Sequence, residues 1–242
     1  RAPFRPVRIG PERLVFDVSA FTVTSPYFGG PVYEPDTTQY LLDHLRPGGT
    51  FVDVGANHGY FTVLAAALVG AAGRVAAFEP NPAVRELLRS HVERNGFEAR
   101  VRIEPCALGA TPSRAARLFV SQDTVNTGLS SFAPGTDALA SGALSARHTV
   151  DVPVDTFDRW FAASGLARVD LLKVDVEGAE DAVISGMAQA LDAGVVTSLI
   201  VETPWQGDVH QRLLAAGYHA RPLDAVGSLT NVLFTRRDDA RR

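Results

Sequence analysis

From residue 50 onward, short apolar runs alternate with segments of helical periodicity, and this alternation restricts the chain to one class of fold. Apolar runs at 50–54, 74–78 and 101–104 have the length of buried strands and are bounded by turn-forming residues. Strands that alternate with helices form a parallel sheet with crossover connections. Four more runs complete the prediction of an α/β fold with a seven-stranded, mostly parallel sheet that ends in an antiparallel hairpin: 171–174, 198–201, 219–223 and 231–234.

Helical periodicity and helix-end signals place the helices between these strands. Asn81 and Pro82 suit the cap and first turn of a helix, and Asn95 with Gly96 suits its end. The sequence predicts this helix together with others at 37–45, 60–69, 155–163, 180–191 and 209–216.

Two regions break the alternation. We expect residues 1–49 to form an N-terminal extension that caps the core, and residues 50–242 to form the main domain. Within that domain, residues 121–148 are rich in Ser, Thr, Gly and Ala without a clear period, and are expected to form an inserted loop. A loop of that length inside a compact domain is usually functional, often as a lid, or else disordered.

Composition and charge narrow the class of protein. The longest apolar stretch, 61–69, is well short of the ~20 residues that span a bilayer, and no apolar segment follows the first arginines as in a signal peptide. The single cysteine, Cys106, fits a reducing cytoplasm. The net charge of −4 and the pI of about 5.9 argue against a nucleic-acid-binding surface. We therefore expect a cytoplasmic protein that acts on neither membranes nor nucleic acids, of open oligomeric state.

The turn after the first strand carries the strongest local signal, Asp53-Val-Gly55-Ala-Asn57-His58-Gly59. Gly55 can adopt backbone angles closed to other residues and lets a ligand lie against the turn. The next helix directs its N-terminal N–H groups at that ligand, which suits the carboxylate of S-adenosylmethionine (SAM), while Asp53 could meet its ammonium group. A dinucleotide is the alternative, but Asn57 stands where the dinucleotide fingerprint has its second glycine.

Glu79 strengthens the prediction of a cofactor site. It ends the second strand, roughly 20 residues beyond the glycine turn, where an acidic side chain can bind ribose hydroxyls. The alternative is a solvated glutamate followed by a helix cap. Pro80, together with Cys106 and Ala107 after the third strand, is expected to form the wall of the same pocket. For Cys106, burial as a small apolar group is favoured over reactivity.

A set of motifs extends over most of the chain: FVDVGANHGYFT (51–62), AFEPNP (77–82), NTGLSS (126–131), LLKVDVEGAE (171–180), the strand-end Glu202, and NVLF (231–234). Tyr33-Glu34-Pro35 also fits, whereas His58 stands where an aliphatic residue is expected. This set resembles the FkbM family of SAM-dependent methyltransferases. The resemblance implies a Rossmann-like class I methyltransferase fold, SAM as cofactor, and O-methylation of a hydroxyl on a small molecule, in natural product or sugar biosynthesis. A nitrogen or carboxylate nucleophile of a small molecule is the alternative acceptor.

Methyl transfer to an alcohol needs a base that removes its proton or a metal ion that lowers its pKa. Asp175 and Glu177 follow the fourth strand and Glu202 ends the fifth, at the edge where open α/β sheets bind their ligands. One of these carboxylates, or His148 from the inserted loop, is expected to be the base. The alternative is a Mg²⁺ ion held by Asp175 and Glu202 with a third oxygen ligand.

Lys173 is the only lysine in a chain that otherwise uses arginine. It lies two residues from Asp175 on a strand, so both side chains leave the same face. Lys173 either orients the acceptor oxygen or forms a buried ion pair with Asp175 or Glu180. Asp175 is also expected to border the cofactor. Glu180 suits the first turn of the next helix and is expected to be structural.

The acceptor-binding residues lie in less regular segments. The resemblance implies that Glu34, Asn126 and Ser130 contact the acceptor, and Trp205, just after Glu202, could line its pocket. Two other classes of function remain. Methylation of bases is disfavoured because Asp-Val-Glu-Gly at 175–178 differs from the Asp/Asn-Pro-Pro-aromatic motif of such enzymes. A non-catalytic SAM- or dinucleotide-binding protein is disfavoured because acids gathered at one edge are costly without a role.

Overall fold

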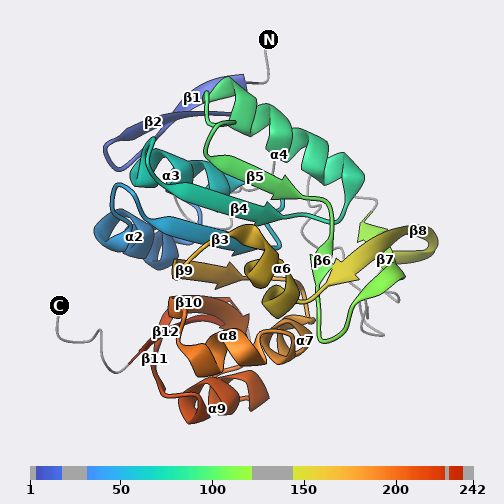
Figure 1. Ribbon diagram of the computed structural model, residues 1–242. Coiled ribbons are helices and arrows are strands. Elements are labelled where there is room, and N and C mark those ends of the chain that lie inside the picture. Colours follow the sequence, from blue (N-terminus) through green and yellow to red (C-terminus); the bar gives the residue numbers. More distant parts are fainter. Residues whose placement is uncertain (1–3, 18–31, 122–143, 227–228, 237–242) are drawn as a thin grey trace.

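A seven-stranded sheet forms the centre of the molecule (Figure 1). The computed structural model describes residues 4–17, 32–121, 144–226 and 229–236. The strands lie in the order β11-β12-β10-β9-β3-β4-β5. In chain order they are β3 (Thr50–Val54), β4 (Arg74–Phe78), β5 (Val101–Glu104), β9 (Val169–Val174), β10 (Val196–Thr203), β11 (Tyr218–Val226) and β12 (Leu229–Arg236). Every strand predicted from an apolar run is present in this sheet.

The pairing directions follow the prediction as well. β4 and β9 both pair parallel with β3, and the parallel pairing continues to β5 on one side and to β10 on the other. β12 pairs antiparallel with β10 and with β11, which gives the predicted terminal hairpin. The sheet is thus mostly parallel, and the carboxyl ends of β3, β4, β9 and β10 share one edge.

Helices cover both faces of the sheet because alternate strand residues point to opposite sides. Val52 and Phe78 pack with α6 (Phe157–Ser164), α7 (Glu180–Ser185), α8 (Ala188–Ala193) and α9 (Asp208–Ala215). Phe51 and Ala77 pack on the other face with α2 (Pro35–His44), α3 (Tyr60–Val69) and α4 (Pro82–Arg94). Helix α4 begins after Asn81 as predicted, because the Asn81 side chain accepts a hydrogen bond from the backbone N–H of Ala83.

One predicted helix is in fact two. The pattern over 180–191 indicates a continuous helix, but the chain forms α7 and α8 with Gly186 between them. A Cβ on Gly186 would lie 2.0 Å from the carbonyl oxygen of Gly109, so the backbones of two segments touch here. This close approach requires glycine and interrupts the helix, which periodicity alone does not reveal.

The N-terminal region contains a hairpin that the sequence analysis does not predict. β1 (Phe4–Ile9) and β2 (Glu12–Asp17) pair antiparallel and pack beside α3 and α4. His91 on α4 joins this hairpin to the glycine turn, since its Nε2 accepts from the backbone N–H of Asp17 at 2.8 Å while its Nδ1 lies 2.6 Å from the carbonyl oxygen of His58. Residues 4–17 therefore pack on the core. The division of the chain at residue 49 stays a prediction.

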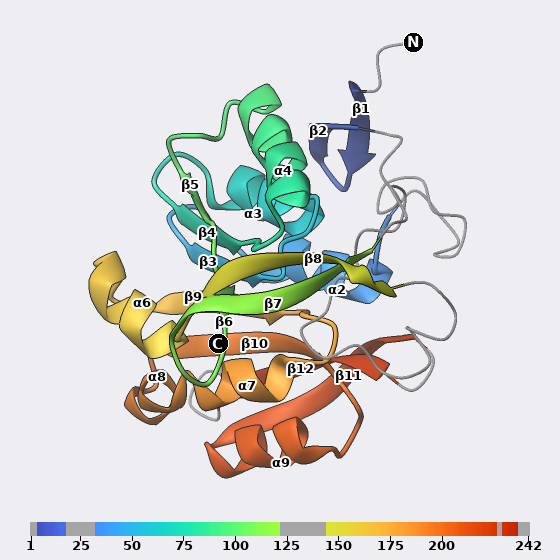
Figure 2. The ribbon, with the colours of Figure 1, turned by 90° about the vertical axis from the view of Figure 1, so that its right-hand side faces the viewer.

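A second, three-stranded sheet replaces part of the predicted loop. β6 (Ala107–Leu108), β7 (Ser113–Ser121) and β8 (Leu144–Asp155) form it in the order β6-β8-β7. The prediction of a loop over 121–148 is therefore wrong at both ends, and 122–143 lie outside the described residues. Figure 2 shows the side of the molecule toward which β3, β4 and β9 point in Figure 1. Strands β7 and β8 run across this side. No helix in the described part of the chain is long and apolar enough to cross a membrane.

Candidate active site

The glycine turn after β3 has the backbone geometry that its sequence requires. Gly55, Asn57 and Gly59 all have positive φ angles, of 83°, 50° and 87°. A Cβ on Gly55 would lie 1.8 Å from the carbonyl oxygen of Asp175, so this turn touches the chain leaving β9. Helix α3 then begins at Gly59 without a side-chain cap. The positive end of the helix dipole at this turn suits an anionic group of a ligand.

Glu79 holds this turn in place. Its Oε2 accepts from the backbone N–H of Asn57 at 2.9 Å and its Oε1 from that of Asn81 at 2.8 Å. Burial raises the pKa of Glu79 to about 7, although these two hydrogen bonds act in the opposite direction. A carboxylate offers about four acceptor positions, so Glu79 can still accept from further hydroxyls.

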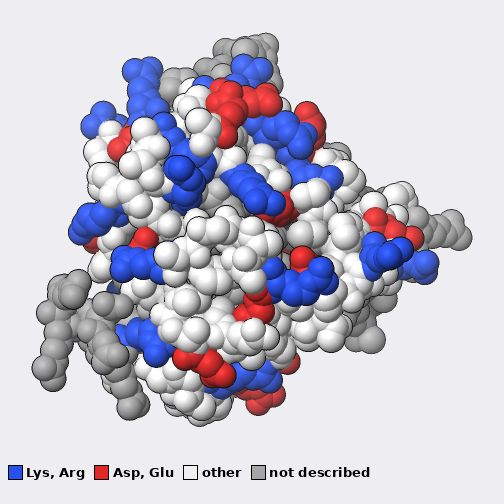
Figure 3. Space-filling model, viewed as in Figure 1, with Lys and Arg blue, Asp and Glu red and all other residues white. Residues whose placement is uncertain are grey.

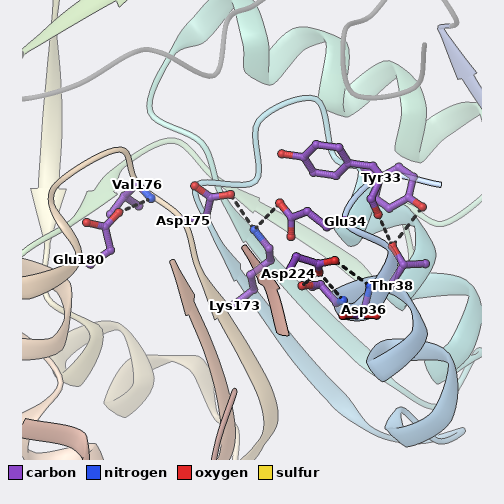
Figure 4. A network of polar contacts seen from close by, with 11 residues as sticks. Tyr33, Glu34, Asp36, Thr38, Lys173, Asp175, Val176, Glu180 and Asp224 are labelled. Atoms are coloured by element: carbon purple, nitrogen blue, oxygen red, sulfur yellow. Dashed lines mark hydrogen bonds and ion pairs between the residues drawn. The ribbon is translucent and has the colours of Figure 1, made fainter. Parts of the chain in front are cut away.

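Lys173 is the centre of a buried cluster of acids (Figure 4). Its Nζ lies 2.7 Å from Asp175 Oδ2, 3.8 Å from Glu34 Oε1, and 4.8 Å from the centre of the Phe61 ring. Asp53 is paired with Lys173 across β3 and β9, and its Oδ2 accepts from Thr62 Oγ1 at 2.5 Å. The predicted ion pair of Lys173 with Asp175 is present.

The charge of Lys173 is fixed by its neighbours. Burial alone would lower its pKa, but the charges of Asp175, Glu34 and Asp53 outweigh burial and raise the pKa above its ordinary value. Burial also raises the pKa of Asp53, to about 6, against the opposing effect of Lys173. Lys173 is therefore a permanent cation, suited to holding anions in place and unsuited to exchanging a proton.

Glu177 and Glu202 lie at the outer side of this cluster and are partly exposed. Burial, with the charge of Asp175 next in size, raises their pKa values to about 8 and about 9. Glu180 has the predicted structural role, because its Oε1 accepts from the backbone N–H groups of Val176 and Gly178 at 3.1 and 3.2 Å. The acids at this edge thus fall into three groups. Asp175 and Glu34 pair with Lys173, Glu177 and Glu202 have raised pKa values, and Glu180 closes the turn.

The other predicted residues have different surroundings. Pro80 and Cys106 are partly buried and Ala107 is buried, and burial raises the pKa of Cys106 to about 11, as expected for an inert thiol. Trp205 is the one exposed large apolar side chain within the described ranges, and its ring meets His210 edge-on. His148 lies exposed on β8 instead of in a loop. Asn126 and Ser130 lie outside the described residues.

His58, the departure from the expected aliphatic residue, is buried at 4% exposure. Burial, followed by the nearby His91, lowers its pKa to about 4, so His58 is neutral and packs as part of the interior.

The sequence predicts Glu34 as a residue that contacts the acceptor but does not predict its proximity to Lys173, which depends on a contact between segments far apart in the chain. Asp224 on β11 was not considered, although its carboxylate binds the first turn of α2. The Tyr33-Glu34-Pro35 motif before a predicted helix was the only signal for this region.

A metal site finds no support in this geometry. Among the described residues, no group of three or more His, Cys, Asp or Glu side chains is arranged to hold a metal ion. Asp175, one of the predicted magnesium ligands, is bound to Lys173 instead.

The FkbM methyltransferase domain matches residues 53–219, which is more than half of the chain. The chain belongs to the FkbM methyltransferase family. The match begins at Asp53 in β3 and ends at His219 in β11, so it includes the glycine turn, Glu79 and Lys173 but not Glu34.

The chain is also similar to individual proteins that are named as methyltransferases. The chain is 30% identical over 166 residues to "31-O-demethyl-FK506 methyltransferase FkbM" of Streptomyces tacrolimicus, covering 60% of this chain and 62% of the relative. It is 31% identical over 97 residues to "Protein-L-isoaspartate O-methyltransferase" of Caenorhabditis elegans, covering 40% of each. The chain thus spans less than two thirds of either relative. These two enzymes are named for different acceptors.

The crystal structure of methyltransferase FkbM from Methylobacillus flagellatus KT has the same fold, with a TM-score of 0.51 at 15% identity. The similarity covers 81% of this FkbM-family chain and 50% of that one. The predicted Rossmann-like class I methyltransferase fold is confirmed.

On the face in Figure 3, basic and acidic side chains are interspersed over the described surface.

Proposed function

We propose that this FkbM-family chain is a SAM-dependent O-methyltransferase that acts on a hydroxyl of a small molecule, such as a natural product or sugar moiety. One observation carries the proposal. The glycine turn, which suits the cofactor, lies against Asp175, which belongs to the cluster of acids around Lys173. A cofactor-binding element and candidate proton acceptors therefore meet at the carboxyl edge of the sheet, where open α/β folds bind ligands.

The residues at this edge fit SAM. Its carboxylate suits the uncapped N-terminus of α3, its ribose hydroxyls suit the remaining acceptor positions of Glu79, and the acids of the cluster suit its positive charge. When bound, SAM supplies a methyl group on a sulfonium sulfur, which is open to attack by a nucleophile. The chain's own residues align the acceptor, exclude water and receive the proton that the hydroxyl loses.

Lys173 contributes by keeping its neighbours in their ionised forms. Its ammonium group holds the carboxylate of Asp175 at 2.7 Å and faces Glu34. Trp205, exposed just beyond Glu202, offers an apolar surface against which an acceptor could pack. We therefore assign acceptor binding to the side of the edge formed by β9 and β10.

The first test is titration of SAM by calorimetry, followed by a screen of hydroxylated small molecules with product analysis by mass spectrometry and NMR. Micromolar binding and a new O-methyl signal are expected. Methyl transfer to nitrogen or to a carboxylate would replace the O-acceptor with the alternative one. No binding of SAM by a folded sample would overturn the proposal. Activity that is lost in EDTA and restored by Mg²⁺ would revive the metal hypothesis.

Replacing Glu79 with alanine is expected to weaken SAM binding about ten- to a hundredfold, since a hydrogen bond to a charged group contributes roughly 1.5–3 kcal/mol. Part of this loss comes from the turn at Asn57, which Glu79 also holds. Calorimetry gives the dissociation constant. Glu86→Ala is the matched control, because Glu86 lies on α4 with a side chain 68% exposed and should leave binding unchanged. Equal binding by both variants would remove Glu79 from the site.

SAM binding by the wild-type chain is expected to tighten as the pH rises through about 7. Burial raises the pKa of Glu79 to about 7, and hydroxyl donors favour its ionised form, so binding releases a proton below that pH. Titrations at pH 6.5 in two buffers of different ionisation enthalpy measure this release. An identical heat in both buffers would contradict it.

A further inference from the structure

Helix α2 begins in an unusual way. Glu34 is its N-cap residue, a position where a side chain ordinarily accepts a hydrogen bond from the first turn of the helix. Glu34 makes no such bond. Its backbone instead has a φ of 41°, in the left-handed region that non-glycine residues seldom adopt. This conformation needs support from the surroundings.

Asp224 provides the cap from the other end of the chain. Its Oδ1 accepts from the backbone N–H of Asp36 at 2.9 Å, and its Oδ2 accepts from the backbone N–H and the hydroxyl of Thr37, both at 2.7 Å. Asp224 lies where the pairing of β11 with β12 shifts register between Pro222 and Ala225. The irregular part of the hairpin therefore brings a carboxylate to the start of α2.

Because Asp224 caps the helix, the Glu34 carboxylate is directed to the active-site cluster (Figure 4). Its Oε1 lies 3.8 Å from Lys173 Nζ. Its Oε2 is buried and has no hydrogen-bond partner among the described residues, and the whole side chain is 5% exposed. A buried polar atom without a partner destabilises the fold, so such an atom in a native protein indicates a role such as catalysis. A hydroxyl group that reached Oε2 would provide the missing donor.

We infer that Glu34 is the catalytic residue that receives the proton of the acceptor hydroxyl, and that Asp224 is the positioning residue that holds Glu34 for this task. The inference rests on the proposed function. As a lone pair of the acceptor oxygen forms the bond to the methyl carbon, the methyl–sulfur bond breaks and its electron pair stays on sulfur. The O–H bond of the acceptor breaks, and its proton moves to Glu34.

The other carboxylates are less suited to receive this proton. Asp175 is bound to Lys173 and Asp53 to Thr62. Glu177 and Glu202 have pKa values of about 8 and 9, so both are mostly protonated at neutral pH.

The charged and titratable groups around Glu34 set its own proton affinity. Burial raises its pKa to about 7, Lys173 and the neighbouring Tyr33 side chain lower it, and Asp175 and Asp224 raise it. Glu202 is a further acid that interacts with Glu34. A base acts best when its pKa is near the working pH.

The first experiment replaces Glu34 with glutamine, which keeps the size of the side chain but cannot take up a proton. The rate constant kcat is expected to fall by roughly a hundredfold or more, while the dissociation constant for SAM stays within about twofold. The acid limb of kcat/KM against pH should disappear. Glu34→Asp retains a carboxylate, so it should keep that limb at a lower kcat. Full activity or an unchanged acid limb in Glu34→Gln would overturn the inference.

The second experiment tests whether Asp224 acts through Glu34. Asp224→Asn is expected to lower kcat about tenfold in the wild-type background and to have no further effect in Glu34→Gln. Removing the charge of Asp224 should also shift the acid limb to lower pH, since that charge raises the pKa of Glu34. A purely structural cap would lower the melting temperature and leave the limb in place, and that result would overturn the positioning role.

Asp43→Asn is the matched control, because Asp43 is an exposed carboxylate on the same helix whose side chain accepts a hydrogen bond from Gln39. Its kcat and pH profile should match those of the wild type. The proposed function fails if the wild-type chain neither binds SAM nor methylates any acceptor. The inference fails by itself if the wild-type chain is active and Glu34→Gln is equally so.

Discussion

Replacement of Lys173 with methionine is expected to destabilise the protein by about 3–5 kcal/mol at pH 7, as usually results when one partner of a buried ion pair is removed. The side chain of Lys173 is 3% exposed, and methionine fills a similar volume without a charge. The loss therefore comes from the carboxylates that remain, chiefly Asp175, Glu34 and Asp53. Denaturant unfolding measures the change. Arg212→Met is the control, because its ion pair with Asp181 is exposed and should contribute at most about 1 kcal/mol.

The defect of Lys173→Met should grow with pH. Burial already raises the pKa of Glu34 to about 7 and that of Asp53 to about 6, and without Lys173 both lose a neighbour that lowers them. An acid whose pKa is higher in the folded state destabilises folding as the pH rises from its unfolded value to its folded value. The variant should thus be closer to the wild type at pH 5 than at pH 8. A defect of equal size at both values would mean that lost packing, not charge, is responsible.

Replacement of Gly55 with alanine is expected to weaken SAM binding by at least a hundredfold and to lower the melting temperature. The added Cβ would lie 1.8 Å from the carbonyl oxygen of Asp175 and 2.9 Å from its carbon, and backbone atoms cannot move aside without displacing β9. Both the cofactor turn and the Lys173 cluster would shift. Calorimetry with SAM and thermal unfolding measure the two effects.

Gly165→Ala is the matched control for this prediction. Gly165, at the end of α6, has a φ of 74° in the left-handed region, but a Cβ there would meet no atom within 4 Å. It therefore carries only the cost of the left-handed backbone, about 1–2 kcal/mol. If Gly55→Ala bound SAM as well as Gly165→Ala does, the contact between the turn and Asp175 would not matter for the site.

The central sheet could be predicted because each of its strands is a short apolar run between turn residues. Strands β7 and β8 could not, since much of β7 is exposed and its stability comes from pairing with a distant partner. The same limit applies to the hairpin β1–β2, which is held by contacts such as Asp17 with His91. Periodicity reports burial along one segment and does not identify the segment with which it pairs.

Some contacts of the candidate site could likewise be predicted from the sequence and others could not. The glycine turn, Glu79 and the pair Lys173–Asp175 are local motifs, and their spacing was enough to bring them to one edge. The approach of Glu34 to Lys173 and the cap that Asp224 places on α2 join segments that are far apart in the chain. Such contacts leave no mark in local spacing, so a sequence can indicate the residue types of a site without indicating which of them meet.

The pairing of β6 with β8 has a consequence for how proteins with this fold can diversify. Ala107 lies opposite Val154 and Leu108 opposite Asp155, so the chain leaves the core and returns to it at neighbouring points. The entropy cost of a longer excursion grows only slowly with its length when its ends are already held together. The segment between these points can therefore be exchanged or lengthened by recombination while the strands that carry Lys173 and Glu79 keep their register. Selection can in this way change what lies over the carboxyl edge and leave the candidate site beneath it intact.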